Sequence, residues 1–293
     1  MSAFTSEAPA SRRVPSDRAR LLNRRLRSVI RWALLLLALA FFLGPVLWIA
    51  MTAFKSQREV FSFPPVFIPE QIDLRHFRAI LSGTGGRALQ DSFVVASMAT
   101  GLSLLVGVPA SYALSRFRIG GDHLPLWILS IRMFPPVVAA IPLFLLYRQI
   151  GIIDTYLGLT LAYLTFNVPF VVWMMKGFFD DLPRELEDAA RVDGANRWQA
   201  FTRIVLPLSV PGLVSTALLC FVFAWNEFLL ALFLTRTNVV TLPVALSSLV
   251  GGHLTLWGQI GALAVVAILP VVILAVVLQR FVVRGLTLGA VKG

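Results

Sequence analysis

The sequence predicts an all-α integral membrane protein with six transmembrane helices. Of its 293 residues, 57% are hydrophobic and 14% are charged, whereas soluble globular proteins have roughly 45–50% apolar and about 25% charged residues. Six apolar stretches are each long enough to cross about 30 Å of hydrocarbon as a helix, which takes about 20 residues. Lysine and arginine are distributed unevenly among the segments that join these stretches. Together these observations place the chain in a bilayer.

The six predicted spans are joined by connections too small for a soluble domain, and several spans contain proline. They cover residues 32–54, 92–115, 124–147, 156–175, 208–234 and 256–278. Neighbouring helices in a bundle satisfy the backbone groups that proline frees, so prolines such as Pro109, Pro135 and Pro136 predict kinks and not helix ends. In the longest connection, residues 55–91, the pattern predicts one short amphipathic helix around 74–81.

The basic residues predict the orientation. A chain with its N-terminus in the cytoplasm has 18 of its 26 Lys and Arg residues on that side and 7 on the other, with Arg132 inside a span. Positive charge favours the cytoplasmic side, so both termini are expected there. Since 8 of the basic residues precede the first span, the net charge of +11 reflects membrane topology, and no nucleic-acid partner is expected.

The first apolar run follows a charged segment of 31 residues and has no cleavage signature behind it, so a permanent span is expected in place of a removable signal peptide. The expected organisation is a basic cytoplasmic segment, a six-helix membrane domain in contact with lipid, and a short cytoplasmic tail. These parts cover residues 1–31, 32–284 and 285–293.

Few residues can carry chemistry. A single cysteine, Cys220, excludes an intrachain disulfide. The three histidines, His76, His123 and His253, lie in three separate loops, so no metal site is expected. None of the three lysines lies in a phosphate-binding G-x-x-x-x-G-K-[ST] loop. The sequence therefore predicts a chain that is not an enzyme and that holds no metal or cofactor.

One charged passage, EDAARVDGANRWQAFTRIVLP (187–207), interrupts the apolar pattern. It predicts a first helix from Asp181 or Leu182, a turn at Gly194, and a second helix that begins after the N-cap Asn196. Apolar or small side chains follow one face of each helix, namely Leu186, Ala189 and Ala190 on the first and Trp198, Phe201 and Val205 on the second. Such a face either packs under its own bundle or docks into another protein, and the pattern leaves both uses open.

The same passage resembles a known signature. Ala189-Ala190-x-x-Asp193-Gly194-Ala195, followed by Phe201, Ile204 and Leu206-Pro207, is similar to the "EAA" motif of permease subunits of bacterial ABC import systems. The stretch FAWNEF (223–228) and the C-terminal GLTLGAVKG (285–293) look like the carbohydrate-uptake, MalG-like branch of that family. One departure is Asp188, which stands where the family has glutamate, although Glu187 lies beside it.

The resemblance implies a type I ABC importer permease fold in which the loop 177–207 carries a coupling helix that sits in a cleft of an ATP-binding subunit. It implies as partners a second homologous permease, two ATP-binding ABC subunits that hold ATP and Mg²⁺, an extracytoplasmic sugar-binding protein and a carbohydrate. It also implies that the loop at Gly251, Gly252, His253 and Leu254 reaches the binding protein and that the C-terminal tail contacts the ATPases. The residues expected to couple to the ATPase are Glu187, Asp188, Ala189, Ala190, Asp193, Gly194, Ala195, Trp198 and Phe201.

Two charges, Arg132 and Glu227, fall within predicted spans, where charged residues are costly and usually functional. They are expected to pair with each other, to line the substrate path or to stabilise a partner. Trp225 and Asn226 beside Glu227 suit a sugar, with a flat ring and an amide for hydroxyl groups. An alternative function is an ion-coupled secondary transporter that uses Arg132 and Glu227, although no inverted repeat is visible to support it.

Overall fold

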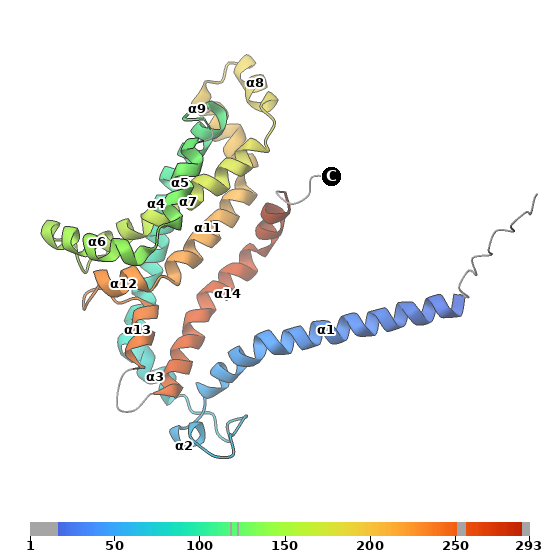
Figure 1. Cartoon of the computed structure of the whole chain (residues 1–293), viewed down its shortest axis with the longest axis vertical. Coiled ribbons are helices and arrows are strands. Elements are labelled where there is room, and N and C mark those ends of the chain that lie inside the picture. The colour runs from blue at the N-terminus through green and yellow to red at the C-terminus, as the bar shows by residue number, and fades with distance from the viewer. Residues whose placement is uncertain (1–16, 118, 122, 251–255, 289–293) are drawn as a thin grey trace, which may run out of the picture. The chain divides into compact units, whose positions relative to one another are not determined.

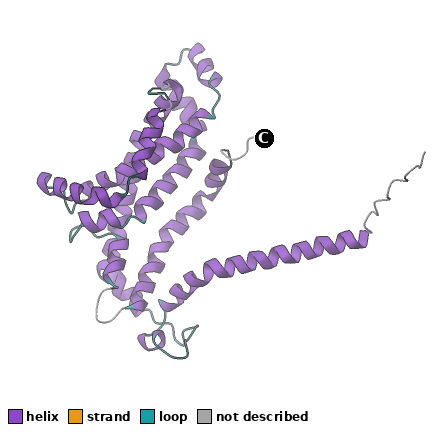
Figure 2. Ribbon diagram, viewed as in Figure 1, coloured by secondary structure: helices purple, strands orange, loops and turns teal. Residues whose placement is uncertain are grey.

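The computed structural model describes residues 17–117, 119–121, 123–250 and 256–288, and within these ranges every regular element is a helix (Figures 1 and 2). The all-α prediction is thereby confirmed. The chain divides into two compact units, residues 1–49 and 50–293.

The first unit is built on helix α1 (Asp17–Thr52), whose C-terminal end continues into the second unit. From Arg25 onward α1 is apolar and long enough to cross a membrane, and Pro45 lies within it. The helix begins well before the predicted span at residue 32, so the expected boundary between a basic segment and a membrane domain falls inside one continuous helix.

The second unit holds the remaining helices. The short predicted helix around 74–81 is confirmed as α3. The elements in chain order are α2 (Gln57–Val60), α3 (Arg75–Ser82), α4 (Thr84–Phe117), α5 (His123–Met133), α6 (Pro136–Ile150), α7 (Tyr156–Asp180), α8 (Glu185–Val192), α9 (Arg197–Ala200), the π-helical turn η1 (Phe201–Val205), α10 (Leu206–Leu208), α11 (Val210–Trp225), α12 (Leu229–Leu234), α13 (Leu242–Ser248) and α14 (Trp257–Leu288).

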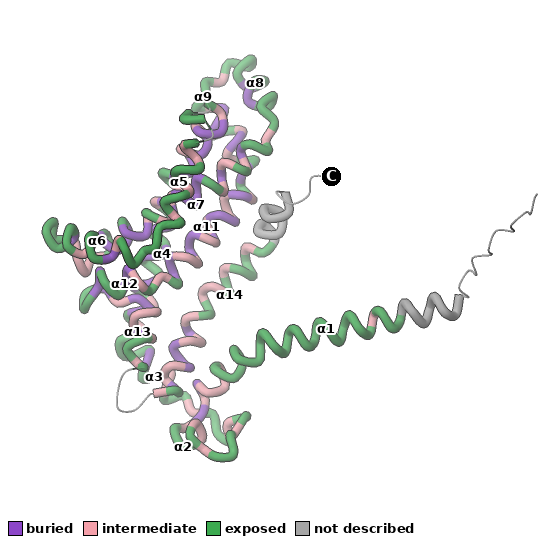
Figure 3. The backbone as a smooth tube through the Cα atoms, in the orientation of Figure 1, coloured by how far each residue is buried: buried purple, intermediate pink, exposed green. Residues whose placement is uncertain are grey.

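The core of this unit forms where α4, α7 and α11 pack together, and buried residues concentrate on these helices (Figure 3). Helix α4 approaches α7 closely because it turns small side chains towards it. At Gly107 an added Cβ atom would lie 2.6 Å from Cγ1 of Val171, so only glycine fits there. Small residues at helix interfaces are typical of membrane bundles, where close van der Waals packing holds the helices together.

Among the described residues, four helices, α1, α4, α7 and α14, are long and apolar enough to cross a membrane, and the number rises to six if two bent pairs each form one span. The third predicted span, 124–147, was wrong as a single helix, because one of the bent pairs lies there. Helices α5 and α6 meet at an angle of 84°. Pro135 is the extended N-cap of α6 and Pro136 occupies its first turn. A residue before proline disfavours helical backbone, so the Pro-Pro pair breaks the helix instead of kinking it.

The fifth predicted span, 208–234, is also interrupted. Helix α11 ends at Trp225, and α12 begins only at Leu229. At its other end, α11 meets the preceding helical segment Arg197–Leu208 at 74°. Pro207 and Pro211 flank this bend, as the sequence predicted.

Candidate functional site

The charged passage forms a helix, a turn and a second helix, as predicted, at one end of the second unit (Figure 1). The predicted start at Asp181 or Leu182 is wrong, because Asp181 caps α7 and α8 begins at Glu185. The turn depends on Gly194, whose φ of 93° lies in a region that side chains with a Cβ atom avoid.

The second helix begins where the sequence predicts it. Asn196 Oδ1 accepts a hydrogen bond from the Gln199 backbone N–H at 2.9 Å, and Gln199 Oε1 accepts one from the Asn196 N–H at the same distance. This reciprocal capping box satisfies two backbone donors that the helix cannot pair internally. The predicted N-cap is therefore confirmed.

Glu187 anchors α8 to the bundle from below. Glu187 is only 8% exposed, and its carboxylate forms an ion pair with Arg116 at the end of α4. The Tyr112 hydroxyl donates to Glu187 Oε2 at 2.5 Å. Arg116 also donates to the Phe179 carbonyl oxygen of α7 at 2.6 Å. One carboxylate thus ties α8 to α4, and one guanidinium ties both to α7.

The second helix is anchored by aromatic packing. Phe201 is buried, and the centre of its ring lies 4.5 Å from that of Tyr112 and 6.3 Å from that of Phe179. Val205 is buried beside it. The sequence left open whether this apolar face packs into the bundle or docks to another protein. Phe201 and Val205 pack into the bundle, whereas Trp198 remains 65% exposed.

The rest of the element forms an exposed face, defined here by Leu186, Asp188, Val192 and Trp198. Val192 is 88% exposed, and the Asp188 side chain is 70% exposed. Of the other expected coupling residues, Ala190 is buried and Ala195 is half-buried, while Ala189 and Asp193 are exposed. An acidic and apolar surface that is rigidly held and open is suited to contact with another protein.

Arg132 does not pair with Glu227 in the described part of the chain. Its Nη1 donates to the Phe166 carbonyl oxygen at 3.1 Å, and its guanidinium lies over the rings of Phe170 and Phe223, at 4.7 and 4.2 Å. These groups belong to α7 and α11. Arg132 therefore joins α5 to both helices through cation–π contacts.

Glu227 lies in the break between α11 and α12 and not within a continuous helix. Its carboxylate accepts the backbone N–H groups of Leu230 at 2.9 Å and Ala231 at 3.1 Å, which caps α12. Trp225 is buried, stacks on Phe221 and donates to the Ala267 carbonyl oxygen of α14 at 3.2 Å. Of the four expected substrate-path residues, Asn226 alone has an exposed side chain.

A second set of carboxylates, which the sequence did not predict, holds the segment between α12 and α13. Asp154 has a left-handed backbone (φ 59°), and its side chain accepts four backbone N–H groups, from residues 236 to 239, at 2.8–3.1 Å. Burial raises the pKa of Asp154, but these four donors outweigh it and the pKa lies below its ordinary value.

Helix α4 holds the same segment from the other side. Asp91 accepts the Val240 N–H at 2.9 Å and the Tyr156 hydroxyl at 2.6 Å, and Ser92 accepts the Leu242 N–H at 2.7 Å. Because most of these donors are backbone amides, no pattern of side chains in the sequence predicts the bonds. The only local signal is the acidic residue at Asp154 just after Gly151 in a turn.

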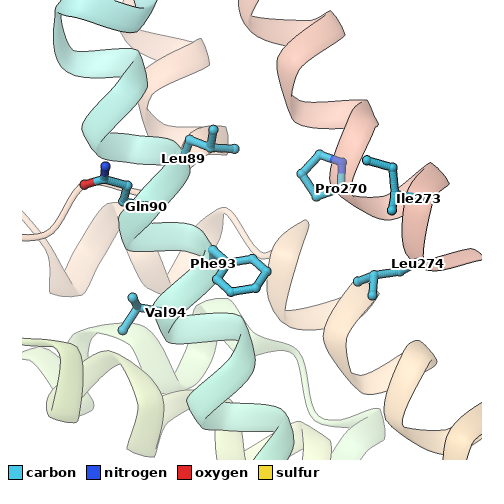
Figure 4. A pocket seen from close by; sticks show the side chains of 7 residues that line it. All are labelled: Leu89, Gln90, Phe93, Val94, Pro270, Ile273 and Leu274. Carbon is cyan, nitrogen blue, oxygen red and sulfur yellow. The ribbon is translucent and has the colours of Figure 1, made fainter. Parts of the chain in front are cut away.

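Among the described residues, no group of three or more metal-binding side chains occurs. An open pocket of about 500 Å³ lies between α4 and α14 and is apolar apart from Gln90 (Figure 4). It offers no charge for a polar ligand. The expected binding-protein loop at Gly251, Gly252, His253 and Leu254 lies outside the described residues, as do the last five residues of the tail.

The comparisons with known proteins agree with this geometry. Residues 87–288 match the family described as "Binding-protein-dependent transport system inner membrane component". The chain belongs to this family. It is therefore a multi-pass permease subunit of an ABC transporter in the bacterial cytoplasmic membrane, which confirms the resemblance seen in the sequence.

The chain is 38% identical to the trehalose transport system permease protein SugB of Mycobacterium tuberculosis, over 91% of this chain and 99% of SugB. It is 34% identical to the trehalose/maltose transport system permease protein MalG of Thermococcus litoralis, over 86% and 92%. Among solved structures it resembles a chain of a bacterial ABC transporter for import of the acidic polysaccharide alginate, with a TM-score of 0.72, 26% identity, and coverage of 88% of this chain and 97% of that one.

Proposed function

We propose that this chain forms one half of the translocation path of an ATP-driven importer and that its cargo is a carbohydrate. The observation that carries the proposal is the helix–turn–helix element at 185–208, which is anchored into the bundle by Glu187 and Phe201 and open on its other side. Relatives named for trehalose and maltose, and a structural neighbour named for alginate import, support the class of cargo.

In the proposed topology, six spans cross the membrane with both termini in the cytoplasm. The bent pair α5–α6 contributes one span and α11 contributes another. In this topology 18 of the 26 Lys and Arg residues would be cytoplasmic and 7 would lie opposite, an imbalance that supports the orientation.

The proposed assembly contains a second permease, two ATP-binding subunits and an extracytoplasmic sugar-binding protein. ATP and Mg²⁺ belong to the ATP-binding subunits. The exposed face of Leu186, Asp188, Val192 and Trp198 is the proposed contact with one of those subunits, and Asp188 supplies its charge. Gly194 sets the angle between the two helices of the element.

Movement of this face would reach the membrane helices through the anchor beneath it. The ion pair of Glu187 with Arg116 and the ring contacts of Phe201 connect it to α4 and α7. Those helices form the core of the unit. A force applied by the ATPase to the exposed face is thus delivered to the core helices, which supports alternating access driven from outside the chain.

For the substrate path, we propose contact through Asn226, whose amide is exposed in the break between α11 and α12. Glu227, Trp225 and Arg132 hold that region in shape through their internal contacts. The loop at 251–254 and the tail at 285–293 are proposed to contact the binding protein and the ATPase subunits.

The decisive test is uptake of labelled trehalose into vesicles that contain the chain and its proposed partners. Trehalose is a disaccharide, and two relatives are named for its transport. Uptake is expected to require ATP on the side of the ATP-binding subunits and the binding protein on the other side. Accumulation by this chain alone, driven by an ion gradient, would instead establish the secondary-transporter alternative.

A further inference from the structure

A pocket lined with arginines lies between the end of α4 and the α8–α9 element. It encloses about 190 Å³, and four arginines contribute to its wall, namely Arg116, Arg184, Arg191 and Arg197. Two carboxylates, Glu187 and Asp188, also line it. The lining therefore carries a formal excess of positive charge, and this excess is concentrated in a concave site.

The internal contacts of these side chains leave part of the charge uncompensated. Arg116 is neutralised by Glu187, and Arg191 lies 3.7 Å from Asp188 in an exposed pair. Arg184 donates to the Ser115 carbonyl oxygen at 3.1 Å, and the Arg197 guanidinium lies 5.1 Å from the centre of the Phe117 ring. Within the described residues, neither Arg184 nor Arg197 forms an ion pair.

We propose that this pocket binds a phosphate group, with Arg184 and Arg197 as its main ligands. Guanidinium groups form paired hydrogen bonds that match the oxygens of a phosphate. The stacking of Arg197 on Phe117 and the hydrogen bond of Arg184 to α4 hold both groups at the wall of the pocket, so little side-chain freedom is lost on binding.

The surroundings favour the headgroup of an acidic phospholipid as the source of this phosphate. The pocket lies at the end of α4, which is long and apolar enough to cross a membrane, and Phe117 in its wall is 46% exposed. In the proposed orientation this end of α4 lies at the cytoplasmic membrane surface. Basic pockets at the cytoplasmic ends of membrane helices bind acidic headgroups. The lipid as source rests on the proposed orientation, whereas binding of free phosphate does not depend on it.

The test compares lipid retention by the purified transporter in nanodiscs of phosphatidylcholine with and without phosphatidylglycerol, measured by native mass spectrometry. Arg184→Gln combined with Arg197→Gln is expected to lower retention of phosphatidylglycerol by roughly thirtyfold, since each basic residue near the surface contributes about one factor of five. The matched control is Arg203→Gln, which removes one charge from the same passage outside the pocket. Size-exclusion chromatography checks that every variant keeps its assembly.

Inorganic phosphate distinguishes the two sources. If phosphate at constant ionic strength displaces the lipid or binds the unliganded pocket, and the double variant abolishes this, the site takes free phosphate as well. If only the lipid responds, the headgroup is the ligand. Equal loss in Arg203→Gln would overturn the proposal, because it would show a general charge effect. Loss of an ATP-binding subunit from the double variant with unchanged lipid would also overturn it, in favour of a protein contact.

Discussion

The α8–α9 element and the segment between α12 and α13 are both held to the bundle by carboxylates, but the partners differ. Glu187 pairs with the side chains of Arg116 and Tyr112. Asp154 and Asp91 instead accept backbone N–H groups of residues 236–240. The Glu187 contacts fix only one side of the α8–α9 element and leave its other face exposed. The Asp154 and Asp91 contacts instead hold the segment between α12 and α13 from two sides.

This difference fits different tasks. An element that must pass a force needs a strong internal anchor and a free outer surface, which α8 and α9 have. A segment that joins α12 to α13 needs only a fixed backbone, and carboxylates that accept several amide N–H groups supply that. Variants that change one arrangement at a time separate their contributions to the free energy of unfolding.

Arg116→Ala and Phe201→Ala are expected to cause the largest losses of stability, and Arg116→Ala tests the ion pair. It leaves the Glu187 carboxylate buried without its charged partner, and breaking such a pair costs about 3–5 kcal/mol. Thermal unfolding of the transporter in detergent measures this loss, and ATP-driven uptake should fall with it. Arg203→Ala, at an exposed position in the same passage, should change the unfolding midpoint little. Equal stability of the two variants would refute the anchor.

Asp154→Asn should have the next largest effect. The amide keeps the shape of the side chain but loses the charge that four backbone donors share, with an expected cost of about 2 kcal/mol. The pKa of Asp154 lies below its ordinary value of 3.8 in the folded protein. Its stabilisation is therefore complete above pH 3.8 and is lost as the pH falls through the lower folded value. The stability of the variant should therefore lack this loss at low pH. If the wild type and the variant lose stability equally as the pH falls, Asp154 does not hold the segment between α12 and α13 through its charge.

Gly194→Val tests the turn between α8 and α9. No atom lies within 4 Å of the position of an added Cβ, so the cost comes from the backbone at φ 93° and not from a clash. That cost is about 1–3 kcal/mol, and transport should be lost because the angle between the two helices changes. Gly194→Asn is the control, since asparagine tolerates left-handed backbone and should retain most uptake. Normal uptake by the valine variant would contradict a coupling role for the turn.

Trp198→Ala should have the smallest effect on stability, within about 0.5 kcal/mol, because the ring is largely exposed. Phe201→Ala, three residues away, removes a buried ring and should cost about 3–5 kcal/mol. Unfolding midpoints of the two variants compare the exposed and the anchored side of one helix. Similar losses would show that Trp198 is part of the core.

The sequence was informative where side chains carry the signal. Asn196, Gly194 and the prolines around Ser209 predicted the N-cap, the turn and the bend, because each acts on its own backbone. It failed where the outcome depends on partners far along the chain. A buried Glu187 and an exposed Asp188 follow from the positions of Arg116 and Tyr112 on α4, and no periodicity within the passage separates the two acids.

The broken spans show the same limit. Pro135-Pro136 was interpreted as a kink, although the extended backbone of Pro135 breaks the helix completely. Glu227 was interpreted as a charge inside a helix, but it caps a new one, because the chain ends α11 two residues earlier. Composition predicts that a stretch is apolar, whereas the continuity of the helix depends on local backbone preferences within it.

The most direct test of the coupling role is co-purification of an ATP-hydrolysing subunit with this chain and with a variant of its exposed face. Leu186→Ser, Val192→Ser and Trp198→Ser together leave Glu187, Phe201 and Val205 in place. The account predicts that the ATPase accompanies the unaltered chain, and that the variant folds and inserts but loses the ATPase. Full retention of the ATPase by the variant, with ATP-driven uptake intact, would contradict it.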